Sequence, residues 1–228
     1  MILTDKMIKA AVEAGTVRLK PFDPKQVQPA SYDLRVGEQG IATSGNAVVE
    51  VRRRGYFELS PGDFGILMTK ELIEFDDRHT ARIGLRSKYA RKGIIATTGP
   101  QVDPGFRGRL KIGVTNLSPH VVTFPYDDDF ITLEIHELSE AVETPYSGAY
   151  QGISDLSPED IEAVTEGENI GFASMLESMR SISSNVSELT KSVERFASQN
   201  ETIQSQYRYT LWIMGIGMGF IALLVALK

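Results

Sequence analysis

The residues best suited to chemistry gather in one stretch, Arg86 to Lys111 (RSKYARKGIIATTGPQVDPGFRGRLK). It carries seven Lys or Arg and a single acid, Asp103, although the whole chain has a formal charge of −6. Such a cluster is either a solvent-exposed basic loop or a binding site for a polyanion. We favour the first interpretation for Lys92 and Lys111. A carboxylate among these cations is placed to hold or polarise a water molecule beside a bound polyphosphate.

The composition excludes several kinds of site. The chain has no cysteine, which rules out a disulfide framework, a thiolate metal site and a zinc deaminase of the His/Cys/Cys type. The three histidines, His79, His120 and His136, show no ligand spacing, so we expect no metal held by protein side chains. The net charge of −6 argues against a nucleic-acid partner, because neutralising phosphates needs a broad basic face.

The elements around the basic stretch predict a mainly β domain over residues 1–152. Runs rich in β-branched residues read as strands at 47–59, 64–75, 109–117, 120–124 and 130–138. Residues 3–17 instead read as a helix, with Thr4 as N-cap and Gly15 as its stop. Many short strands in one domain favour an antiparallel barrel or jelly roll. Residues 153–171, with six acids and no base, read as a solvated linker with one short helical turn capped by Ser157.

Beyond this linker, residues 172–207 repeat with a different period. Apolar residues recur alternately three and four positions apart for five heptads, with Asn200 at one core position. The seam residues are Phe172, Met175, Met179, Ile182, Val186, Leu189, Val193, Phe196, Asn200, Ile203 and Tyr207. A parallel coiled-coil stalk is the favoured interpretation, and a single amphipathic helix packed back on the barrel is the alternative.

The last segment, residues 208–228, reads as a membrane anchor. Tyr209 to Leu227 is 19 residues without a charge, and a helix of that length reaches roughly 28 Å. Tyr209 and Trp212 are suited to the membrane interface, and Arg208 lies just outside it. No signal-peptide pattern opens the sequence, so we expect a single-pass C-terminal anchor in the lipid bilayer, with the catalytic domain cytoplasmic.

Four segments of the β domain resemble the dCTP deaminase/dUTPase superfamily. They are QPASYDLRVG (28–37), LRSKYARKGI (85–94), VDPGFRGRLKIGVTN (102–116) and ELSEAVETPYSGAYQG (137–152), and the N-terminal MILTDKMIKAAVEAG is similar to the start of dCTP deaminases. The resemblance covers about residues 1–157. It implies a distorted jelly-roll β-barrel of the dUTPase-like type that assembles as a homotrimer, nucleotide sites shared between subunits, and Mg²⁺ bound through the triphosphate of dUTP or dCTP. The coiled coil and anchor lie outside the ordinary family pattern.

The resemblance also implies roles for individual residues. Ser87 matches the family's phosphate-binding serine and Arg91 its arginine, while Phe106 takes the place of the aromatic residue that stacks on the deoxyribose. Asp103 matches the aspartate that is the general base for the attacking water in dUTPases, and Asp33 matches a first-motif aspartate that is more often structural. The implied catalytic residue is therefore Asp103, and the implied substrate-binding residues are Arg86, Ser87, Arg91, Phe106, Tyr146 and Gln151.

The sequence also departs from the deaminase pattern. In dCTP deaminases a catalytic glutamate shuttles protons as water adds to the cytosine ring, and the matching position in RLKIGV is Gly113. Lys88 replaces the second serine of the family's RSS pattern, and Ala149 and Ile153 replace the lysine and the last glutamine of its KYQGQ motif. The Gly-rich arginine-bearing tail of dUTPases is absent too.

Three functions remain open from the sequence. The favoured one is a membrane-tethered, dUTPase-like hydrolase that gives a nucleoside monophosphate and pyrophosphate. A dCTP deaminase is disfavoured, because Glu134, on another strand, would have to replace the missing glutamate. A non-catalytic nucleotide sensor coupled to the membrane through the stalk is the third.

Overall fold

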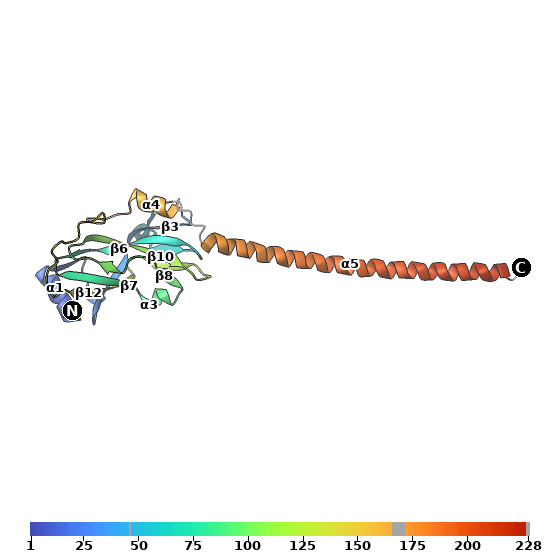
Figure 1. Cartoon of the computed structure of the whole chain (residues 1–228), viewed down its shortest axis with the longest axis horizontal. Coiled ribbons are helices and arrows are strands. Elements are labelled where there is room, and N and C mark those ends of the chain that lie inside the picture. The colour runs from blue at the N-terminus through green and yellow to red at the C-terminus, as the bar shows by residue number, and fades with distance from the viewer. Residues whose placement is uncertain (46, 166–171, 227–228) are drawn as a thin grey trace. The chain divides into compact units, whose positions relative to one another are not determined.

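The computed structural model describes residues 1–45, 47–165 and 172–226, and in the last range it describes side chains at 178–196 and 206–218. The chain forms two compact units, Met1–Met175 and Leu176–Lys228. The first is built mainly of antiparallel strands and the second is helical (Figure 1).

The first unit is a curled antiparallel sheet whose strands follow the order β8-β10-β6-β3-β12-β7-β9, with β1 on β6 and β2 and β4 on β3. A separate pair joins β11 to β5. The strands are β1 (Val17–Lys20), β2 (Val27–Gln28), β3 (Ser31–Ala42), β4 (Val49–Glu50), β5 (Tyr56–Leu59), β6 (Phe64–Phe75), β7 (His79–Leu85), β8 (Ile94–Ala96), β9 (Gln101–Val102), β10 (Arg107–Asn116), β11 (Val122–Pro125) and β12 (Asp129–Glu137). The helices are α1 (Asp5–Ala14), α2 (Val51–Arg54), α3 (Ser87–Ala90), α4 (Pro158–Thr165) and α5 (Phe172–Ala226), with a 3₁₀ turn at Pro24–Gln26. The mainly β prediction is confirmed.

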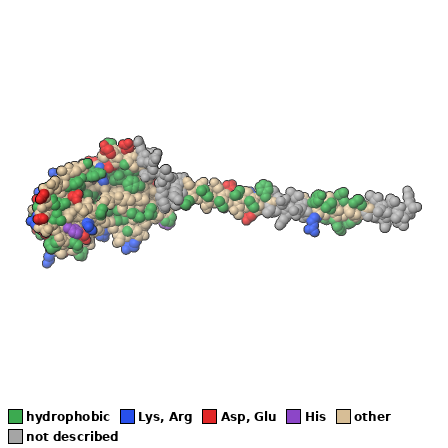
Figure 2. Space-filling model, viewed as in Figure 1, with side chains coloured by type: hydrophobic (Ala, Val, Ile, Leu, Met, Phe, Trp, Pro, Cys, Tyr) green, Lys and Arg blue, Asp and Glu red, His purple; other side chains and the backbone are tan. Residues whose placement is uncertain are grey.

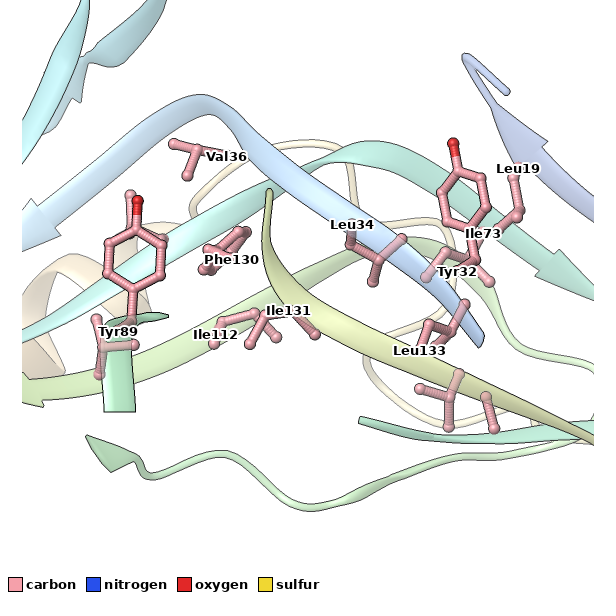
Figure 3. Close-up of a cluster of buried hydrophobic side chains, with 14 of the residues drawn as sticks. Leu19, Tyr32, Leu34, Val36, Ile73, Tyr89, Ile112, Phe130, Ile131 and Leu133 are labelled. Atoms are coloured by element: carbon pink, nitrogen blue, oxygen red, sulfur yellow. The ribbon is translucent and has the colours of Figure 1, made fainter. Parts of the chain in front are cut away.

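The core lies inside the curled sheet, because the long strands alternate buried and partly exposed side chains. Tyr32 and Leu34 of β3 lie against Ile131 and Leu133 of β12, whose side chains point into the same cluster (Figure 3). These four side chains are fully buried. Burying a side chain of this size contributes about 1.5–3 kcal/mol, so the paired strands β3 and β12 form a firm base for the loops at their ends.

A buried ion pair crosses this core between β3 and β6. The Arg35 guanidinium donates through Nε to Glu71 Oε1 at 2.6 Å, and the Arg35 backbone N–H donates to Glu71 Oε2 at 2.9 Å. The Glu71 side chain is 0% exposed. Asp127 lies 3.2 Å and Asp23 3.5 Å from Arg35 Nη1. The pair fixes β3 against β6, since neither charge is tolerated alone in the core.

Two expectations for the first unit are corrected. The predicted strand at 47–59 is interrupted by α2, a helical turn that ends at Gly55, where φ is +88°. The helical turn predicted after Ser157 is present as α4, but it is not part of a solvated linker, because it packs over β3 and β6 and buries Val164 to 2% exposure (Figure 1). Residues 153–165 therefore belong to the folded first unit, because an apolar side chain inside this acidic run finds a place on the sheet.

Over its described residues, the second unit is formed by helix α5 from Leu176 onward. Described seam residues such as Ile182, Val186 and Leu189 are 57–66% exposed in this helix, and hydrophobic side chains are visible along it (Figure 2). Self-association of the helix stays a prediction. Over the part of the chain that the structure describes, no helix has an apolar stretch of the length needed to cross a membrane. The expected membrane-spanning segment, Tyr209–Leu227, is thus unsupported, and the side chains of 219–228 lie outside the described residues.

Candidate functional site

The turn between β9 and β10 carries Asp103 and Phe106. It reverses direction at Gly105, whose φ of +82° is unfavourable for residues with a side chain. A Cβ at Gly105 would also lie 2.6 Å from Cβ of Pro145, so the turn and the 144–153 segment approach too closely for any other residue. The sequence DPG thus places the Phe106 ring inward, where it is 7% exposed.

The 144–153 segment holds this turn through a series of backbone contacts. Tyr146 N–H donates to Pro104 O at 2.8 Å, and Arg109 N–H donates to Ile153 O at 2.8 Å. The Gln151 amide bridges the turn, because its Oε1 accepts from Arg107 N–H at 2.9 Å and its Nε2 donates to Gly105 O at 2.9 Å. Gln151 was expected to bind substrate, yet here both ends of its amide are used by the turn that carries Phe106.

Asp103, Phe106 and Tyr146 line one pocket of about 380 Å³. The other lining residues are Thr98, Gly99, Gln101, Val102, Arg109, Leu110, Lys111, Tyr150, Ile153 and Asp160. The Phe106 and Tyr146 rings are tilted with centroids 5.9 Å apart, and Gln101 Nε2 donates to Asp103 Oδ1 at 2.6 Å. Asp103 and Tyr146 also line a neighbouring pocket of about 410 Å³, so the carboxylate lies between two cavities. An aromatic wall beside an oriented carboxylate can hold a sugar ring and activate a water molecule.

The basic wall of the pocket comes from β10. A bulge in this strand falls between Arg109 and Lys111, and the Leu110 N–H donates to Thr69 Oγ1 at 2.9 Å. The Arg109 guanidinium is fixed by Lys70 O at 2.7 Å. Lys111, expected as part of a solvated loop, instead lies in the pocket and is ion-paired with Asp160 of α4.

Gly113, at the position that matches the deaminase glutamate, lies on β10 two residues beyond the pocket-lining Lys111. A Cβ built there would lie 2.7 Å from Thr97 Oγ1 and 3.2 Å from Phe64 Cε2. The Gly113 N–H donates to Thr98 Oγ1 at 2.6 Å, and the Thr97 N–H donates to Gly113 O at 2.9 Å. Any side chain at this position must displace Thr97. Glu134, the expected substitute, lies on β12 beside His136 at 2.7 Å and does not line the pocket.

The expected phosphate-binding residues lie elsewhere in the same chain, on α3. Ser87 begins this helical turn and Arg91 follows it, and both side chains are exposed. Arg86 is ion-paired with buried Asp33 and, at 2.9 Å, with Asp129. None of these residues lines the pocket around Asp103. A single chain therefore presents the phosphate-binding candidates and the Asp103 pocket as separate surfaces.

Lys88 explains how the α3 turn is held. Its Nζ donates to Asp128 at 2.8 Å and to Asp129 at 2.7 Å, and the Tyr89 hydroxyl donates to Asp128 at 2.6 Å. Burial acts to raise the pKa of Asp128, but these hydrogen bonds outweigh it, so the pKa lies below its ordinary value. By contrast, burial raises the pKa of Asp33 despite the adjacent Arg86. The lysine that replaces a family serine is thus an anchor of the turn.

Sequence reasoning missed three contacts of this region, namely the Lys111–Asp160 pair, the Gln151 bridge and the Lys88 anchor. The run of six acids after the barrel could have predicted the Lys111–Asp160 pair, because a basic pocket attracts carboxylates. The other two join residues far apart in the chain and carried no local signal.

Comparison with solved structures supports the fold. The chain is similar to 2'-deoxycytidine 5'-triphosphate deaminase from Agrobacterium tumefaciens, with a TM-score of 0.51 and 18% identity. That match covers 60% of this chain and 49% of the solved chain, about half its length.

Sequence comparison defines the family. Residues 2–126 match the model described as dCTP deaminase-like. The dCTP deaminase of Thermococcus sibiricus is 32% identical over 156 residues, covering 68% of this chain and 95% of the relative. A dUMP-forming dCTP deaminase of Aquifex aeolicus is 29% identical over 171 residues, covering 71% and 95%. The chain belongs to the dCTP deaminase-like family.

Proposed function

We propose that the chain binds a pyrimidine deoxynucleoside triphosphate and hydrolyses it to the nucleoside monophosphate and pyrophosphate. The observation that supports this most directly is the joint presence of Asp103 and Phe106 in one pocket, while the deaminase glutamate position is Gly113. In this reaction Asp103 takes a proton from water as the water oxygen bonds to the α-phosphorus. The bond from that phosphorus to the oxygen bridging to the β-phosphate breaks, and pyrophosphate leaves.

Deamination of dCTP is the reaction suggested by the names of the relatives, and it is less well supported for this chain. It needs a group that moves protons at the cytosine ring, and Gly113, which stands at the position of the deaminase glutamate, has no side chain to do so. The Thr98 hydroxyl, which lines the pocket, accepts a hydrogen bond from the Gly113 N–H at 2.6 Å. We therefore place dUTP before dCTP as the substrate.

Mg²⁺ is expected to enter with the nucleotide. Among the described residues, no group of three His, Asp or Glu side chains is arranged to hold a metal ion. The chemistry that Mg²⁺ supplies when bound is neutralisation of the triphosphate, which makes pyrophosphate a better leaving group. The chain's own contribution would be phosphate contacts from Ser87 and Arg91.

A homotrimer would complete the site. Exposed Ser87 and Arg91 lie outside the pocket that contains Asp103, so a neighbouring subunit is needed to bring phosphate donors to it. Light scattering of the purified protein tests this, and a monomer at micromolar concentration would contradict it.

The helix α5 supports a further part of the proposal, association of the chains as a parallel stalk tethered to a membrane. Its exposed apolar seam supports the stalk. The tether rests on the uncharged sequence Tyr209–Leu227 alone, because among the described residues no helix has an apolar stretch long enough to cross a membrane. The same arrangement would suit a nucleotide sensor without turnover. Cell fractionation tests the tether, and recovery of the full chain in the soluble fraction without detergent would contradict it.

The decisive experiment is a panel of dUTP, dCTP and dTTP with Mg²⁺, in which pyrophosphate and ammonia are measured together and binding is measured separately. We expect pyrophosphate without ammonia, and Asp103→Asn should lower the rate by about 10²–10⁴-fold. Arg91→Ala should mainly weaken binding. Binding without either product would favour the sensor, and ammonia from dCTP would overturn the hydrolase.

A further inference from the structure

The candidate pocket contains a carboxylate that the proposed reaction does not use. Asp160 of α4 is ion-paired with Lys111 of β10, and the two side chains are only 16% and 12% exposed. Both line the same pocket as Asp103 and Phe106. The protein's own carboxylate therefore occupies an anion position beside the pocket lysine.

Asp160 is held in this position by its own helix. Its Oδ2 accepts from Ser157 N–H at 2.7 Å and from Ser157 Oγ at 2.8 Å. The helix is attached to the sheet by buried Val164 and by the Leu156 N–H, which donates to Gln39 Oε1 at 3.0 Å. The Lys111 ion pair is a third contact of this eight-residue helix with the sheet, so losing that pair weakens the attachment of α4.

The charge of the pocket depends on α4. Its lining contains two cations, Arg109 and Lys111, and two carboxylates, Asp103 and Asp160, which cancel. Without Asp160 the same lining carries a net +1. The exposed acidic side chains over α4 (Figure 2) are screened by salt, so the effect on an incoming anion comes mainly from the partly buried Asp160.

We propose that α4 is a displaceable strap, in which Asp160 occupies Lys111 until an anionic group of the bound nucleotide replaces it. The inference rests on the proposed function of this pocket. Because α4 docking and nucleotide binding compete for one lysine, each weakens the other by the same factor. Nucleotide binding thus releases the segment that precedes α5 in the chain.

Asp160→Asn in the full chain tests the competition. The substitution keeps the shape and the Ser157 contacts but removes the charge, and isothermal titration with Mg²⁺-dUTP and Mg²⁺-dCTP should show about 10-fold tighter binding. Glu162→Gln, which changes an exposed acid of the same helix, is the matched control and should change the Kd by less than about 2-fold. In a Lys111→Met background, Asp160→Asn should give no gain.

Hydrogen exchange of amides in α4 tests the displacement independently. Saturating nucleotide should speed exchange at 158–165 in the wild-type chain by about 10-fold. If nucleotide binds but Asp160→Asn gains nothing, or the exchange at α4 is unchanged, the strap is refuted and the proposed function stands. If neither the wild-type chain nor Asp160→Asn binds dUTP or dCTP, the proposed function fails and the strap with it. Binding by Asp160→Asn alone supports the strap.

Discussion

Replacing Gln151 by alanine distinguishes a residue that shapes the site from one that touches the nucleotide. The Gln151 amide makes two hydrogen bonds of 2.9 Å, with Arg107 N–H and Gly105 O. Each such bond contributes about 0.5–1.5 kcal/mol, and we take the lower end because the side chain is exposed. The expected loss of stability is therefore about 1 kcal/mol, or a fall in Tm of about 2–4 °C for a chain of this size.

The more telling readout is where the effect falls. Hydrogen exchange should accelerate at the Arg107 amide, which loses its acceptor, and stay unchanged in β12. Because the Phe106 turn would loosen, dUMP and dUTP should lose affinity by the same factor. A glutamine that contacts phosphate would instead weaken dUTP alone.

Two further variants complete the test. Gln151→Glu keeps an acceptor for Arg107 N–H but places an oxygen against Gly105 O, so it should resemble Gln151→Ala. Ser147→Ala, at an exposed position in the same segment, should behave as wild type. Unchanged exchange at Arg107 in Gln151→Ala, or an affinity loss confined to dUTP, would refute the positioning role.

Three other predictions concern the framework of the site. Glu71→Gln should lower the free energy of unfolding, measured in urea, by about 3 kcal/mol, because it leaves Arg35 charged in the core. Glu58→Gln, in an exposed ion pair, is the control and should leave the unfolding midpoint unchanged. Equal midpoints for the two variants would contradict this. Gly105→Ala should lower stability by at least about 1 kcal/mol, since its φ is +82°, and wild-type thermal unfolding would count against the tight approach of the turn. The folded-state pKa of Asp128 is lowered, so its stabilising contribution is present above its unfolded pKa near 4 and is lost as pH falls through the folded value. Asp128→Asn should therefore reduce the dependence of the free energy of unfolding on pH in the acid range. An unchanged pH dependence would contradict this role of Asp128.

Much of the framework follows from local sequence patterns. The helix at 5–14 ends at Gly15, as expected from an apolar period followed by a residue able to adopt positive φ. The strand β6 matches its predicted run, and β10, β11 and β12 overlap theirs to within two residues, because alternating apolar residues bury only one face of a sheet. The strand predicted at 47–59 was wrong in its middle, where Val51 is buried by a helical turn instead. A short apolar run does not distinguish these two ways of burying one valine.

The residues of the candidate site also fall into two groups, those predicted from the sequence and those brought together only by the fold. The resemblance to the deaminase and dUTPase motifs predicts Asp103 and Phe106 as site residues and places Gly113 at the position of the deaminase glutamate. It did not determine which residues meet across the chain. Only the folded chain pairs Lys111 with Asp160, 49 positions away.

The hydrogen bond between Gln151 and Arg107, which are 44 positions apart in the chain, likewise forms only in the folded chain. These contacts depend on the strand register and on the position of α4 on the sheet. Both are determined by many weak contacts acting together. The sequence therefore determined the groups available for chemistry. The tertiary structure decided which of them face the pocket. Ion pairs and hydrogen bonds form only when two side chains lie within a few ångströms, and local sequence patterns do not specify the distance between segments that are far apart in the chain.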